Sequence, residues 1–209
     1  MTKQQPDGFL AVPRSGKGPG VLVLHPWWGL NDTMKDLCTR LAAEGFVAFA
    51  PDLYHGKVAT TIAGAESLSN ALSGKTGKAD VARAVEHLAE KATGPKLAVV
   101  GFSMGAYFAI DLAAADSARI AKVVVFYGTG PADHARSKAE YLGHFAKGDP
   151  YEPDAGVAEV EEALKKAGRP VTFHRYDAGH WFFESDQKDA YDPAAAKQAW
   201  DRTLAFLKR

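Results

Sequence analysis

The sequence of 209 residues lacks features that define several classes of protein. A single cysteine, Cys38, excludes a disulfide framework, and its helical spacing with Met34, Leu37 and Leu41 predicts a buried packing residue. A net charge is also missing, because 25 basic residues balance 25 acidic ones and no basic stripe appears. This balance argues against nucleic acid and against an anionic membrane surface as partners.

Long apolar runs are absent as well. The segment M-T-K-Q-Q-P-D has none of the apolar character of a signal peptide, and no run of the chain approaches membrane-spanning length. We therefore expect a cytoplasmic protein that has no membrane partner. No His/Asp cluster has metal-ligand spacing, and neither G-T-G-P-A-D nor S-G-K-G-P-G matches a phosphate loop. The sequence thus predicts no metal site and no other cofactor.

Strand-like and helix-like segments alternate along the chain, without repeats or low-complexity stretches. The segments G-F-L-A-V-P and V-L-V-L-H-P are joined by R-S-G-K-G-P-G, which predicts an antiparallel hairpin. Further strands are expected near residues 47–50, 97–101, 123–127, 141–146 and 171–176, and helices at residues 32–44, 80–92, 104–114, 155–167 and 194–207. This alternation predicts one α/β domain over residues 1–209, with a doubly wound, mostly parallel sheet of about seven strands and helices on both faces.

A serine lies between two glycines where a strand is expected to turn into a helix. The run L-A-V-V-G-F-S-M-G-A-Y-F-A-I-D-L-A places Ser103 between Gly101 and Gly105. This is the G-x-S-x-G pattern of a nucleophile elbow, in which a strained turn presents the central side chain above the sheet. The positive end of the new helix would lie beside the hydroxyl, where acyl transfer develops negative charge. Ser103 is therefore predicted to be a nucleophile.

The candidate base follows in the order that an α/β-hydrolase requires, with the histidine near the C-terminal end. His180 in D-A-G-H follows the strand-like V-T-F-H-R-Y, so its imidazole should lie on a loop past the C-terminal end of a strand. His174 lies inside that strand and His87 inside a helix, and both are predicted to be structural. His180 is the predicted general base.

The candidate acid is Asp149 in K-G-D-P-Y-E-P, because the preceding strand ends at K-G and leaves the carboxylate on a loop. Asp154 is expected to open the next helix as its N-cap. Asp177 is only three residues from His180, too close to approach the far side of the imidazole comfortably. Asp149 is therefore the predicted orienting carboxylate of a triad.

Acyl transfer also needs two convergent N–H donors, one from the residue after the nucleophile and one from the loop after an earlier strand. The first is Met104. The second lies in V-L-V-L-H-P-W-W-G, where Pro26 has no N–H, so Trp27 is the predicted donor and Trp28 the reserve. Two adjacent tryptophans at the open end of a parallel strand also favour a pocket wall, although a turn packed with indoles is the alternative.

The chain resembles the dienelactone hydrolase family of α/β-hydrolases from about Asp7 to its C-terminus. The resemblance rests on V-L-V-L-H-P-W-W-G-L-N, G-F-V-A-F-A-P-D-L-Y, V-V-G-F-S-M-G-A, G-D-P-Y-E-P and Y-D-A-G-H-W-F. It implies the α/β-hydrolase fold without a separate cap domain. It also implies that the family's catalytic triad falls on Ser103, Asp149 and His180.

Three positions depart from the family's pattern. Typical members have a cysteine nucleophile and a glutamate just before the oxyanion donor of the earlier loop, where this chain has Ser103 and, before Trp27, Pro26. Members that act on dienelactone hold its carboxylate with arginines, one of them four residues after the histidine, where this chain has Glu184. The resemblance therefore implies a serine hydrolase that cleaves another small ester or lactone through an acyl-enzyme intermediate.

The expected pocket lies around the aromatic residues beside the triad. Trp28, Trp181, Phe182 and Glu184 are predicted to line it and to favour neutral acyl groups. The expected partner is a small-molecule ester or lactone, and the protein would be a monomer or homodimer. A thioesterase or small peptidase with the same triad stays open, as does a non-catalytic binding protein on the same fold. Residues 128–138 are expected to form a surface loop, with a partial lid as the alternative.

Overall fold

The computed structural model describes residues 5–209. Residues 1–4 lie outside the described residues. They belong to the polar segment in which the sequence predicted no signal peptide. The strands are β1 (Gly8–Ala11), β2 (Gly20–Leu24), β3 (Val47–Pro51), β4 (Leu97–Phe102), β5 (Ile120–Phe126), β6 (Glu140–Ala146) and β7 (Val171–Tyr176). The helices are α1 (Asp32–Ala43), α2 (Ile62–Ala71), α3 (Gly74–Lys91), α4 (Met104–Ala115), α5 (Asp154–Lys166) and α6 (Pro193–Leu207).

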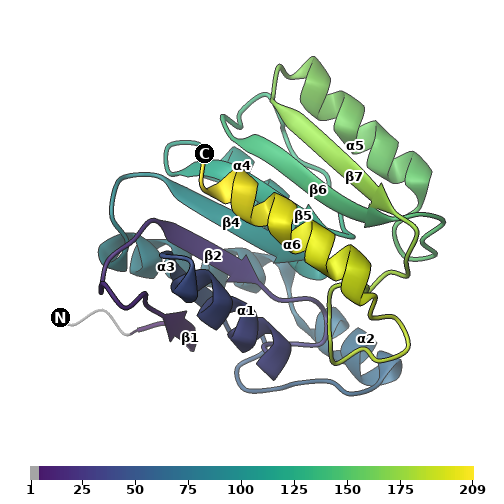
Figure 1. Cartoon of the computed structure of the whole chain (residues 1–209), viewed down its shortest axis with the longest axis horizontal. Coiled ribbons are helices and arrows are strands. Elements are labelled where there is room, and N and C mark those ends of the chain that lie inside the picture. The colour runs from purple at the N-terminus through teal and green to yellow at the C-terminus, as the bar shows by residue number, and fades with distance from the viewer. Residues whose placement is uncertain (1–4) are drawn as a thin grey trace.

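The strands form one sheet in the order β1-β3-β2-β4-β5-β6-β7. Every neighbouring pair is parallel except β1 and β3, which are antiparallel. Figure 1 shows helices on both faces of this twisted sheet, with α1 and α6 in front. The predicted fold class, a doubly wound and mostly parallel sheet, is confirmed.

Both faces of the sheet are buried, and successive residues of β2 show how. Val21 and Val23 belong to an apolar layer that includes residues of α1 and α6, whereas Leu22 and Leu24 belong to the opposite layer, which includes residues of α3, α4 and α5. Side chains of a strand point alternately to its two faces, so a strand covered on both sides must be apolar throughout. This explains the uninterrupted apolar run before His25. Within residues 5–209, no helix combines the length and apolar character needed to cross a membrane.

The predicted hairpin between the first two strands is wrong. Strand β1 pairs with β3, and β2 lies between β3 and β4 with both of its edges occupied. The glycine-rich link does not fold back, because its carbonyls bind other elements: Gly18 accepts from Thr93 N and Pro19 accepts from Val47 N, each at 2.9 Å. The link therefore passes along the end of the sheet and leaves β1 on the free edge of β3.

Two helical segments between β3 and β4 differ from the prediction. Helix α2 was not predicted, and α3 begins at Gly74 instead of residue 80. Local caps start both helices, since Thr61 Oγ1 accepts from Gly64 N and Ser73 Oγ accepts from Thr76 N. Helix α2 buries only Ala65, so its sequence carries almost no amphipathic pattern from which a helix could be predicted.

Asp154 does not have the role of N-cap that the sequence suggested. It is the first residue of α5, whereas Pro153 occupies the cap position. A carboxylate in the first turn still interacts favourably with the positive end of the helix. The error amounts to one residue and leaves the position of α5 unchanged.

Candidate active site

The serine elbow joins β4 to α4 as the sequence predicts. Ser103 has φ 48° and ψ −113°, a strained conformation, and its N–H donates to Phe126 O at 2.9 Å. The flanking glycines are needed for space: a Cβ on Gly101 would lie 2.4 Å from Gly105 O, and one on Gly105 would lie 2.2 Å from Leu24 O. The backbone thus packs too closely here for any larger residue, and Ser103 is left half-buried with its hydroxyl above the sheet.

The structure brings Ser103, His180 and Asp149 together in one hydrogen-bonded line. His180 Nε2 lies 3.3 Å from Ser103 Oγ, and His180 Nδ1 lies 2.6 Å from Asp149 Oδ2. Because an ionised carboxylate can only accept, Nδ1 carries the proton and Nε2 is free to accept from the serine hydroxyl. His180 and Asp149 are both buried, which protects the line from competing water.

The carboxylate of Asp149 is itself held by the backbone. Its other oxygen, Oδ1, accepts from the amides of Tyr151 at 2.8 Å and Glu152 at 3.2 Å. The two alternatives for the acid lie elsewhere. Asp154 is exposed on α5, and Asp177 is exposed on the loop before His180. Asp149 is therefore the carboxylate that the fold places against the imidazole.

The two predicted oxyanion donors lie on neighbouring segments. Met104 is the first residue of α4, where a helix leaves its amide without an internal partner. Trp27 lies in the turn after β2. The close approach of Gly105 to the carbonyls of Leu24 and His25 shows that this turn starts against the first turn of α4. Neither amide donates to any acceptor in the part of the chain that the structure describes.

An aromatic cluster, formed by Trp27, Trp28, Tyr151 and Trp181, surrounds His180. Ring centroids of Tyr151 and Trp181 lie 5.0 and 5.3 Å from that of His180, and Trp27 stacks on Trp181 at 6.1 Å. Sequence reasoning missed Tyr151, although its place two residues after Asp149 could have indicated it. The three indole nitrogens are buried and have no acceptor within residues 5–209. They are neutral donors beside the triad.

Two predicted pocket residues are not at the surface of the site. Phe182 and Glu184 both have an exposed fraction of 0%, so the prediction that they line the pocket is wrong. Phe182 packs against Tyr127 and Tyr176. The turn at residues 180–183 leaves Trp181 half-buried and the three residues after it buried.

Glu184 has a buried partner that sequence reasoning also missed. Its Oε1 accepts from the hydroxyl of Tyr127 at 2.6 Å. Burial raises the pKa of Glu184 to about 8, so its carboxyl group holds a proton at neutral pH. The ring of Tyr127 in turn lies 4.9 Å from that of His180. Tyr127 therefore lies between Glu184 and the imidazole and contacts both.

The loop at residues 128–138 is packed onto the elbow where it begins. A Cβ on Gly128 would lie 2.5 Å from Ser103 O, and Thr129 donates through its N–H and its hydroxyl to the carboxylate of Glu152. These contacts tie the start of the loop to the segment that carries Asp149. Nowhere in residues 5–209 do three or more His, Cys, Asp or Glu side chains gather in a way that could hold a metal ion.

The sequence profile of the dienelactone hydrolase family matches residues 7–209. Protein usf of Aquifex pyrophilus is 34% identical over 213 residues, which cover 96% of this chain and 92% of that protein. A candidate carboxymethylenebutenolidase of Aquifex aeolicus is 31% identical over 214 residues, with 96% and 92% of the two chains covered.

A solved structure gives the same result for the fold. The crystal structure of a candidate dienelactone hydrolase from Klebsiella pneumoniae superposes with a TM-score of 0.85 and is 25% identical. The superposition covers 96% of this chain and 91% of that one. The similarity therefore extends over nearly the whole of each protein.

Proposed function

Because this chain belongs to the dienelactone hydrolase family and is a hydrolase of ester or lactone bonds, we propose that Ser103 is its nucleophile. The observation that carries the proposal is the position of His180 between Ser103 Oγ at 3.3 Å and Asp149 Oδ2 at 2.6 Å. A nucleophile, a base within reach of it and a third group that orients the base are the parts that acyl transfer needs.

The reaction proceeds in two halves. Ser103 Oγ attacks the carbonyl carbon of the substrate while its proton passes to His180 Nε2, and this proton then goes to the departing alcohol oxygen. Water next attacks the acyl-enzyme with His180 as base, releasing the acid and restoring the serine hydroxyl. Throughout, Asp149 holds the proton on Nδ1 and stabilises the imidazolium that forms.

The negative charge on the carbonyl oxygen is stabilised by the amides of Trp27 and Met104. Both amides are unpaired within the described residues, as donors for a transient oxyanion should be. Met104 also lies at the N-terminus of α4, where the helix dipole favours negative charge. One such donor contributes roughly 10²-fold to 10³-fold to kcat in well-studied acyl transfer.

The substrate that this site suits is a small, neutral ester or lactone. Trp27 and Trp181 are half-buried and Tyr151 is exposed, so aromatic surface is available beside Ser103. Glu184 is buried and protonated, so neither attraction nor repulsion of a substrate charge comes from that position. The aromatic rings suit the apolar body of an uncharged substrate.

The proposal is tested with a panel of aryl esters, lactones and acyl thioesters, together with an aryl ester that carries a carboxylate on its acyl part. We expect the neutral ester or a lactone to have the highest kcat/KM, and Ser103→Ala to lower kcat by up to about 10⁶. An organophosphonate should add its mass to Ser103 in the wild type only. Near-normal turnover by Ser103→Ala would overturn the assignment of the nucleophile.

A further inference from the structure

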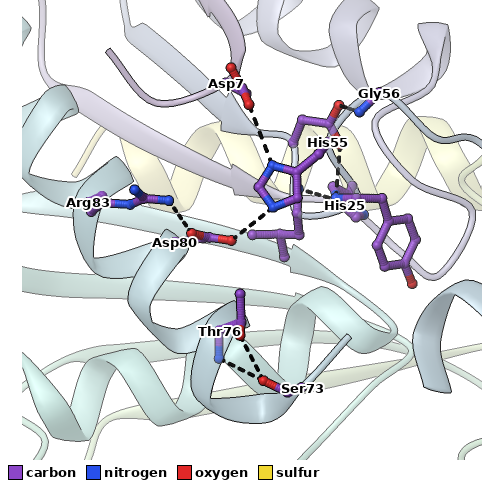
Figure 2. A network of polar contacts seen from close by, with 11 residues as sticks. Asp7, His25, His55, Gly56, Ser73, Thr76, Asp80 and Arg83 are labelled. Atoms are coloured by element: carbon purple, nitrogen blue, oxygen red, sulfur yellow. Dashed lines mark hydrogen bonds and ion pairs between the residues drawn. The ribbon is translucent and has the colours of Figure 1, made fainter. Parts of the chain in front are cut away.

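His25 is a fully buried histidine that takes no part in the proposed reaction, yet both of its ring nitrogens are engaged. It follows β2 directly and has an exposed fraction of 0%. Its Nε2 lies 3.1 Å from the backbone N of Leu53, and its Nδ1 lies 2.7 Å from the carbonyl oxygen of Pro26. Figure 2 labels His25 among the polar contacts of the loop after β3.

These two partners determine the tautomer of His25. A backbone N–H can only donate, so Nε2 must be the unprotonated nitrogen that accepts from Leu53. The proton is then on Nδ1, which donates to Pro26 O. Burial lowers the pKa of His25, which keeps the ring neutral and preserves the acceptor on Nε2.

The bond to Pro26 O orients the next peptide group. In a trans peptide the C=O of one residue and the N–H of the next lie in one plane and point in opposite directions. The carbonyl of Pro26 and the amide of Trp27 belong to one such unit, and no peptide bond in residues 5–209 is cis. A donor that holds the carbonyl therefore also sets the direction of the Trp27 N–H.

We infer that His25 is a positioning residue that aims the Trp27 amide at the developing oxyanion. The inference rests on the proposed function, since it assigns a role toward that reaction. Gly29 N also donates to Pro26 O, at 3.1 Å, but it belongs to the same short turn. His25 is the partner that ties the carbonyl to another part of the fold.

The same histidine reaches toward Met104, the other proposed oxyanion donor. Its ring contacts that of Tyr54, with centroids 5.0 Å apart, and the hydroxyl of Tyr54 lies 3.3 Å from Met104 Sδ. His25 therefore joins the turn of Trp27 to the loop that packs on Met104. A displacement of this loop would move the amides of both Trp27 and Met104, so anchoring the loop keeps the two amides in position.

The loop after β3 is anchored from its outer side as well. Asp52 accepts from the amides of Tyr54 at 3.0 Å and Gly56 at 2.6 Å. His55, with φ 51°, lies between Asp7 at 3.4 Å and Asp80 at 3.5 Å, and Arg83 pairs with Asp80. Figure 2 shows His55 between Asp7 and Asp80, with Arg83 on the far side of Asp80.

Two variants separate the bonds of His25. In His25→Asn the side-chain amide can replace Nδ1 as donor to Pro26 O. His25→Gln reaches the position of Nε2 instead and leaves Pro26 O with Gly29 N alone as its donor. We expect kcat for a neutral aryl ester to fall about 10²-fold in His25→Gln with KM nearly unchanged. His25→Asn should retain kcat within about tenfold of the wild type, because it keeps the orienting bond.

The control is His87→Gln, which replaces another buried histidine far from the triad and should alter stability without altering kcat. Thermal melts of all variants separate loss of fold from loss of orientation. Equal kcat values for His25→Asn and His25→Gln would overturn the inference. Failure of the wild type to react with an organophosphonate would instead count against the proposed function.

A measurement on the unmodified protein covers the case in which both variants fail to fold. The ¹⁵N chemical shifts of His25 should report a neutral ring protonated on Nδ1 from pH 6 to 8. Protonation on Nε2 instead would remove both the acceptor for Leu53 and the donor to Pro26. That result would refute the positioning role whatever the variants do.

Discussion

At the scale of single residues, two histidines are each confined to one tautomer by what surrounds them. His180 is protonated on Nδ1 because Asp149 accepts there, and His25 is protonated on Nδ1 because Leu53 donates to its other nitrogen. The first tautomer leaves a base facing Ser103, and the second holds a peptide group. The neighbours of each imidazole thus decide whether it acts as a base or as a structural donor.

The tautomer of His180 makes Asp149→Asn a specific test. An asparagine at this position can donate to Nδ1 and so stabilise the tautomer that has its proton on Nε2, which cannot accept from Ser103. We expect kcat to fall by roughly 10⁴, and steady-state kinetics on a neutral aryl ester will measure it. Asp177→Asn is the matched control on an exposed site and should cost little. A larger loss in Asp177→Asn than in Asp149→Asn would mean that the acid is misassigned.

Glu184 makes the stability of the protein depend on pH. Its pKa is raised from a usual 4.5 to about 8, so between these values the folded protein holds a proton that the unfolded chain has released. The contribution is complete below pH 4.5 and is lost as the pH rises through 8, at about 1.4 kcal/mol per pH unit. Glu184→Gln keeps an acceptor for Tyr127 and removes the titration.

Urea denaturation at pH 5 and pH 8 measures this effect. Relative to Glu184→Gln, the wild type should lose free energy of unfolding as the pH rises from 5 to 8, because all other titrating groups are shared. The variant should accordingly be the more stable of the two at pH 8. Parallel pH profiles for the two proteins would show that Glu184 is ionised in the folded state.

At the scale of elements, the backbone of the site packs tightly where α4 begins, directly after β4. The first turn of this helix packs on the carbonyls at the end of β2, and the same contact brings the segments of Trp27 and Met104 together. The elbow and the second donor loop are therefore one packed unit. Disturbing the helix start should affect both the nucleophile and the oxyanion donors.

Gly105→Ala tests this unit. Its Cβ would lie 2.2 Å from the backbone carbonyl of Leu24, so the start of α4 must move, and we expect about 1–3 kcal/mol of destabilisation with a large loss of kcat. Gly156→Ala, in α5, is the control, because a Cβ there meets nothing within 4 Å. That change should stabilise the protein by up to about 1 kcal/mol and leave kcat unchanged. Denaturation curves measure the free energy of unfolding of both variants, and steady-state kinetics measure their kcat. Normal activity of Gly105→Ala would contradict the packing argument.

At the scale of the whole molecule, the sheet separates two apolar layers that differ in their helices. Helices α1 and α6 cover one face, and α3, α4 and α5 cover the other (Figure 1). Strands β2 and β4 are completely buried and have neighbours on both sides, whereas β1 and β7 are edge strands with half-exposed residues. Stability should therefore decrease from the centre of the sheet to its edges.

Native-state hydrogen exchange measures this gradient. Amides of β2 and β4 should exchange only through global unfolding, and those of β1 and β7 should open at a lower free energy. The two edge strands also differ in direction, because β1 is antiparallel to its neighbour and β7 is parallel to its own. Their exchange rates can therefore be compared with each other in the same molecule. If β7 proves as well protected as β4, the edge of the sheet is covered by something other than its own chain.

Patterns that are local in the chain could be predicted from the sequence. The glycines around Ser103, the alternating strands and helices, and the loops that follow strand ends led to the elbow, to the sheet and to the residues that now lie beside Ser103. Each depends on steric limits of a few consecutive residues or on a repeat of side-chain faces. Such limits act before any distant contact forms.

The partner of β1, the burial of Glu184 and the role of His25 were decided only by the tertiary structure. Strand β1 joins β3 because both edges of β2 are already taken, which no segment of the sequence records. Glu184 holds a proton because the fold buries it completely, against Tyr127, which is 57 residues away in the chain. His25 has its tautomer from Leu53, which lies in the loop after β3. Local patterns state what a residue can do, but its charge and orientation depend on distant neighbours that only packing supplies.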